Sequence, residues 1–157
     1  MSASHLVAIK EAMQPLTQQF NLRVVGESDL SNWSEVDYGN NTTGLSVAID
    51  WSEFRPFVRI GELIQGVLPL APTSIKDAEH IKSFDVDDIL LIRVKGGSPV
   101  GKMLGARDDQ AVERLMREYA VALKLHAADI LSGDFVIFPE LTRIVKARFD
   151  EMRPRTH

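Results

Sequence analysis

The chain has 157 residues, 45% of them hydrophobic and 25% charged, which is typical of one globular domain large enough to bury its own core. It contains no cysteine, which excludes disulfides, thiolate nucleophiles and cysteine-ligated zinc. Its formal charge of −4 has the wrong sign for a general nucleic-acid-binding protein. We expect a cytoplasmic protein with no membrane partner, because no signal-peptide pattern opens the chain and its apolar runs are far shorter than the roughly 20 residues that span a bilayer.

The N-terminus predicts an amphipathic helix. Its apolar residues recur at spacings of three and four, and we expect them to form the buried face: Leu6, Ile9, Met13, Leu16 and Phe20. Pro15 lies inside this pattern and predicts a kink or a break near residue 14, because proline lacks the N–H that a helix interior uses.

An antiparallel meander follows over residues 22–63. The clearest strand signal is the alternation of Leu45, Val47 and Ile49 with small or polar residues, which predicts one buried and one open face. Weaker patterns predict further strands at 22–25, 36–39 and 54–63. The connections are too short for parallel crossovers, so neighbouring strands should run antiparallel.

The middle of the chain is less regular. Residues 66–83 predict a loop with one helical turn near Asp77. Residues 85–93 fit either a buried strand or a short helix, and we favour the helix because Asp85 can cap it and Arg93 falls in its last turn. The glycines between 96 and 105 predict a flexible connector.

Two amphipathic helical patterns occupy residues 112–152. Gly133 stands where a left-handed residue would end the first helix, and Pro139 suits the opening turn of the second. We expect five of their apolar side chains in the core: Leu123, Ile130, Leu141, Ile144 and Phe149. The change from period two to period 3.6 predicts a single α+β domain over 1–157, with an N-terminal helix, an antiparallel β-meander and a C-terminal helical pair packed on one sheet face.

Two motifs suggest ligands, and each has a simpler interpretation. Residues 96–102 match the glycine and lysine spacing of a phosphate-binding loop, but Met103 replaces the hydroxyl that would hold magnesium, so we favour a hinge. Carboxylates accompany one histidine between residues 77 and 88, and the candidate metal ligands are Asp77, His80 and Asp85. Their spacing matches no calcium loop, so we expect solvated or helix-capping carboxylates and neither a metal nor a cofactor.

A third group of residues offers a candidate catalytic cleft. His126 lies on the apolar side of the first C-terminal helix, and Asp129 three residues later could orient its imidazole, with Tyr119 two turns earlier. A half-buried histidine paired with a carboxylate is also common in purely structural networks. No nucleophile that would complete a catalytic set is recognisable.

Aromatic residues gather around the predicted meander. If they face outward rather than into the core, four of them would mark a binding surface: Trp33, Tyr38, Trp51 and Phe54.

The segment 117–135 carries a resemblance, centred on the run His126-Ala127-Ala128-Asp129-Ile130-Leu131-Ser132-Gly133-Asp134-Phe135. It resembles the C-terminal part of a group of small, uncharacterised bacterial α+β proteins, in which a meander precedes a helix that ends in a Gly-Asp-Phe turn. The resemblance implies an α+β fold and, loosely, an immunity or accessory role. It implies no catalytic residue.

These observations favour a non-catalytic protein that binds another protein, or itself as a homodimer. The alternative is an enzyme or small-molecule-binding protein that uses a cleft near Tyr119, His126 and Asp129.

Overall fold

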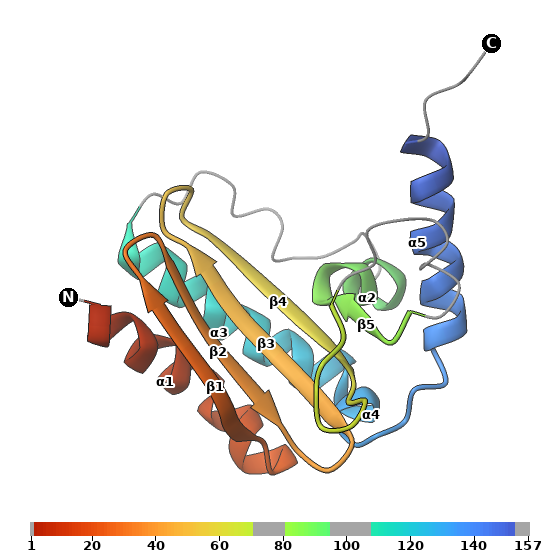
Figure 1. Cartoon of the computed structure of the whole chain (residues 1–157), viewed down its shortest axis with the longest axis horizontal. Coiled ribbons are helices and arrows are strands. Elements are labelled where there is room, and N and C mark those ends of the chain that lie inside the picture. The colour runs from red at the N-terminus through yellow and green to blue at the C-terminus, as the bar shows by residue number, and fades with distance from the viewer. Residues whose placement is uncertain (1, 71–80, 95–107, 153–157) are drawn as a thin grey trace.

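The computed structural model describes residues 2–70, 81–94 and 108–152, and within them the predicted α+β fold is confirmed (Figure 1). The elements in chain order are α1 (Ser2–Phe20), β1 (Arg23–Leu30), β2 (Trp33–Gly39), β3 (Thr43–Asp50), β4 (Arg55–Glu62), β5 (Ser83–Asp85), α2 (Val86–Arg93), α3 (Asp109–His126), α4 (Ala128–Leu131) and α5 (Phe138–Met152).

Helix α1 follows the predicted apolar face. Ile9, Met13 and Leu16 are fully buried. The helix runs unbroken through Pro15, so the predicted break is wrong. Pro15 lies on the exposed side while its neighbours Met13 and Leu16 anchor the chain in the core, and that packing outweighs the lost backbone hydrogen bond.

The five strands form one antiparallel sheet in sequence order, β1-β2-β3-β4-β5. The pairings Val36↔Val47 and Val47↔Val58 place three fully buried valines in one row on the inner face. Helices α1 and α3 lie side by side behind this face (Figure 1). The predicted meander is therefore present, and its helical cover comes from both ends of the chain.

Strand β5 was not predicted, because three residues are too short to show any periodicity. It pairs with the C-terminal half of β4, and Gly61 permits the approach: a Cβ at this position would lie 2.3 Å from the backbone oxygen of Lys82. The expected helical turn near Asp77 and the connector at 96–105 fall outside the described residues.

Helix α2 confirms the favoured interpretation of residues 85–93. Asp85 has an extended backbone, and its side chain accepts a hydrogen bond of 2.9 Å from the amide of Asp87, which satisfies a free donor at the helix start. Ile89 and Leu90 are fully buried.

The first C-terminal helical pattern is divided at Ala127 into α3 and α4, which was not predicted, whereas the stop at Gly133 and the start near Pro139 are as predicted. Gly133 has a φ of +95° after α4, and Pro139 is the second residue of α5. Leu123, Ile130 and Leu141 are fully buried, as expected. Ile144 is only half-buried because α5 extends beyond the sheet edge (Figure 1), and the side chain of Phe149 lies outside the described residues.

One cluster of buried side chains joins α1, the inner sheet face and helices α2 to α5. Among the described helices, none is long and apolar enough to cross a bilayer.

Candidate functional site

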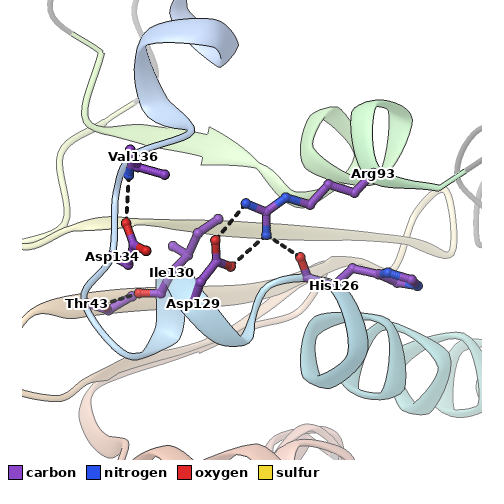
Figure 2. A network of polar contacts seen from close by, with 7 residues as sticks. All are labelled: Thr43, Arg93, His126, Asp129, Ile130, Asp134 and Val136. Atoms are coloured by element: carbon purple, nitrogen blue, oxygen red, sulfur yellow. Dashed lines mark hydrogen bonds and ion pairs between the residues drawn. The ribbon is translucent and has the colours of Figure 1, made fainter.

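Arg93 organises a polar network at the end of α2 (Figure 2). Its Nη1 and Nη2 donate to the two carboxylate oxygens of Asp129 at 2.6 and 2.7 Å, and Nη1 also donates to the carbonyl of His126 at 2.5 Å. The guanidinium lowers the pKa of Asp129, and the carboxylate raises the pKa of Arg93. Nearby, the Thr43 hydroxyl donates to the carbonyl of Ile130 at 2.7 Å, so this network ties α2, α3, α4 and β3 together.

The predicted pairing of His126 with Asp129 is wrong. The carboxylate of Asp129 faces Arg93, whereas the imidazole of His126 points away from it (Figure 2). The reason is local: α3 ends at His126, and Ala127 leaves the helical region with φ −130° and ψ 19°. Residues 126 and 129 therefore do not lie on one helical face, which an i, i+3 pair requires.

Tyr119 belongs to a different contact. It is 5% exposed, and its hydroxyl lies 3.0 and 3.1 Å from the two carboxylate oxygens of Asp87 at the start of α2. Burial and the charge of Asp87 raise the pKa of Tyr119, so the phenol stays protonated and donates. The three candidate cleft residues thus serve two separate contacts that hold α2 to the C-terminal helices.

The acidic residues at the start of α2 have structural partners. Asp85 caps the helix, Asp87 accepts from Tyr119, and Asp88 lies 2.5 Å from a guanidinium nitrogen of Arg148. Burial raises the pKa of Asp85 to about 6. The described residues contain no group of three or more histidine or acidic side chains that could hold a metal ion. Asp77 and His80 lie outside those residues, as does the motif at 96–102.

The four aromatic candidates separate into core and surface. Tyr38 is only 3% exposed. Trp51 stacks on His5 with ring centroids 3.8 Å apart, donates to the Ser34 hydroxyl at 2.9 Å, and meets Phe54 edge-on. Trp33 alone among the four points to the outer face of the sheet.

No described helix covers the outer face of the sheet (Figure 1). This face carries aromatic and charged side chains. The Trp33 ring stacks on Phe57 with centroids 5.8 Å apart, and the guanidinium of Arg55 lies 4.9 Å above the Phe57 ring. Strand alternation places Glu35 and Asp37 on the same face, next to Ser46 and Arg59.

A hollow of about 320 Å³ opens on this face between the strands and the loop after β4, and Glu35, Asp37, Ser46 and Arg59 line it. Burial and the adjacent Asp37 carboxylate raise the pKa of Glu35. A hydrogen bond of 3.1 Å from the Trp33 indole lowers it, but by less. The guanidinium of Arg59 donates to Ser83 and to the Pro69 carbonyl and to neither carboxylate of this pair. Burial lowers the pKa of Arg59, and the charge of Asp85 acts in the opposite direction. Within the described residues, no lysine or arginine forms an ion pair with Glu35 or Asp37.

The sequence analysis missed Glu35, Asp37 and Arg59. A signal was present, because residues 33, 35 and 37 alternate with the buried Ser34, Val36 and Tyr38. That pattern puts Trp33 and two carboxylates on one open face.

No family model, curated protein or solved structure matches the chain.

Proposed function

We propose that this protein acts without catalysis, by binding another protein through the outer face of its sheet. A lysine or arginine of that partner enters the hollow beside Glu35 and Asp37. The observation that carries the proposal is this half-buried acidic pair, which forms no ion pair within the described residues and lies on a face that no described helix covers.

Charge complementarity favours a basic side chain as the occupant. Burial raises the pKa of Glu35, and the hydrogen bond and like charge of Asp37 raise it further, because two adjacent carboxylates repel each other. An ammonium or guanidinium group placed between them would relieve this repulsion and form charge-assisted hydrogen bonds. A partner surface that covers the hollow would strengthen these bonds by excluding water.

The aromatic stack beside the hollow adds an apolar contact. Trp33 stacks on Phe57, whose strand partner Ala48 is 3% exposed. Leu30 is paired with Trp33 at the sheet edge and has 61% of its surface exposed. Large aromatic side chains such as tryptophan are enriched at the energetic centre of protein interfaces.

The alternative function has less support. An enzyme using Tyr119, His126 and Asp129 would need their side chains in one cleft, and each of these residues instead contributes a bond that fixes α2. A protein-binding role in the cytoplasm also agrees with the accessory or immunity role that the sequence resemblance implies, and with a chain that has no cysteine.

Site-specific photo-crosslinking tests the proposal. A photoreactive phenylalanine analogue replaces Leu30 on the outer face, or Val121 on α3 as a control of matched exposure, 57% against 61%. In cells that naturally contain the protein, we expect position 30 and not position 121 to capture one partner, through a partner segment that contains lysine or arginine.

Charge removal gives the decisive comparison. The double variant Glu35→Gln/Asp37→Asn should reduce binding of the captured partner by about tenfold or more. Glu113→Gln/Glu118→Gln on α3 should leave it unchanged. Equal capture at both positions, or binding that is insensitive to Glu35 and Asp37, would contradict the proposal. If position 30 captures only a second copy of this chain, the binding partner is the protein itself and the complex is a homodimer.

A further inference from the structure

A second pocket lies at the end of the sheet, separate from the acidic hollow. Its volume is about 720 Å³, and five segments meet around it: the end of α1, the start of β1, the β2–β3 turn, the loop after β4 and the end of α4. Val25, Leu63 and Gly66 line both this pocket and the hollow, so they form the rim that divides the two.

Asn40 fixes the wall of the pocket. Its Nδ2 donates to the carbonyls of Phe20 and Leu131 at 3.0 and 2.9 Å, and its Oδ1 accepts from the amides of Thr42 and Thr43 at 3.0 and 2.8 Å. Two helix-terminal carbonyls that would otherwise give the wall a negative character are therefore occupied. The side-chain amide also holds α1, α4 and the β2–β3 turn in one fixed arrangement.

The remaining polar groups of the lining are rich in hydrogen-bond donors. Five lining side chains bond to no group of the described residues, and they carry one guanidinium, three amides and one hydroxyl: Gln19, Asn21, Arg23, Asn41 and Ser132. The chain has 22 acidic residues, yet none of them lines this pocket. Arg23 is thus the single charged side chain of the lining, so the pocket is locally positive in a protein of formal charge −4.

We propose that this pocket binds a small hydroxylated organic anion. The carboxylate or phosphate oxygens of the ligand face the Arg23 guanidinium, which pairs with either group through two parallel hydrogen bonds. The ligand hydroxyls meet the amides of Asn21 and Asn41 and the hydroxyl of Ser132, which can donate and accept. Binding here is independent of the outer sheet face, because none of these side chains lines the acidic hollow.

Titration of the isotopically labelled protein tests this inference. The probes are gluconate for the carboxylate, glucose 6-phosphate for the phosphate, inorganic phosphate alone, and sorbitol as the uncharged polyol, all at constant ionic strength. Nuclear magnetic resonance follows the Nε–H of Arg23 and the side-chain amides of Gln19, Asn21 and Asn41. We expect saturable shifts at these groups with at least one of the two hydroxylated anions, and the arm that binds identifies the anionic group.

A matched pair of arginine variants decides the outcome. Arg23→Gln should weaken the binding by about tenfold or more, because it removes a charge-assisted contact. Arg114→Gln changes an exposed arginine on α3 and should leave binding unchanged. Shifts that fail to saturate with both hydroxylated anions, or binding that survives Arg23→Gln, would overturn the inference. Equal affinity for sorbitol would overturn the assignment of an anion.

Discussion

Replacing Asn40 by alanine removes the side chain that joins three distant parts of the fold. The amide makes four hydrogen bonds to backbone groups, on Phe20, Leu131, Thr42 and Thr43, at 2.8 to 3.0 Å. In the variant, the carbonyls of Phe20 and Leu131 lose this partner at partly buried positions, and the β2–β3 turn loses the acceptor that holds its two amides.

The expected destabilisation follows from these bonds. A typical hydrogen bond contributes a net 0.5–1.5 kcal/mol, and a buried group left unpaired costs about 1–3 kcal/mol. Asn40 is half-buried, so water replaces some of the lost partners. The four bonds share one side chain and do not add independently. We therefore expect Asn40→Ala to lower the free energy of unfolding by about 2–4 kcal/mol, a large part of a typical stability of about 5–15 kcal/mol.

Urea unfolding followed by circular dichroism measures this change, and Asn41→Ala is its control. Asn41 is the adjacent residue, is exposed, and bonds through its side chain to no described group, so its loss should change stability by less than about 0.5 kcal/mol. A cost below about 0.5 kcal/mol for Asn40→Ala, or equal effects of the two variants, would refute the reasoning.

Three further predictions concern the elements around α2 and α4. Gly133→Val should lower the free energy of unfolding by about 1–3 kcal/mol, because a β-branched residue would have to adopt a φ of +95° with its Cβ 2.9 Å from the Thr42 hydroxyl; chemical denaturation measures this, and an unchanged midpoint would contradict it. In the folded protein the pKa of Asp85 is raised to about 6, so Asp85 keeps a proton that it loses above about pH 4 in the unfolded chain. Asp85 therefore favours the folded state most at low pH, and its contribution to the free energy of unfolding should fall as the pH rises from about 4 to 6. Asp85→Asn keeps a capping oxygen and should stabilise the protein at pH 7 by up to about 3 kcal/mol, an effect that vanishes near pH 4, and denaturation at both pH values checks the sign. A double-mutant cycle of Arg93→Gln and Asp129→Asn should give a coupling free energy of about 1 kcal/mol for this partly exposed pair. A value near zero would contradict a stabilising role for this ion pair.

Local sequence patterns identified most of the elements. The spacings in α1 and α3 and the alternation of large apolar residues in β3 arise because one face of each element packs in the core. That packing leaves a period that can be read without knowing what covers the face. The turn at Gly133 and the cap at Asp85 were also predictable, since each depends on the conformational freedom or hydrogen bonding of a single residue.

The contacts of the functional candidates were harder to predict, because their partners lie far away in the sequence. The sequence places His126 near Asp129, but the partner that Asp129 takes is Arg93, 36 residues earlier. A one-residue departure from the helix at Ala127 redirected that carboxylate, and no periodic pattern shows such a change. Glu35 and Arg59 share a hollow only because the register of β2, β3 and β4 aligns them.

The sequence by itself determined the fold class, the amphipathic faces and the exclusion of cysteine chemistry, since composition and local periodicity suffice for these. Only the tertiary structure decided which groups meet: the contact of Asn40 with Leu131 spans 91 residues, and the acidic pair lies uncovered because both sheet-covering helices lie on the other face. The physical reason is that a side chain's burial and partners depend on strand register and on the path of the chain. These are set by the free energy of the whole packed core and not by any single segment.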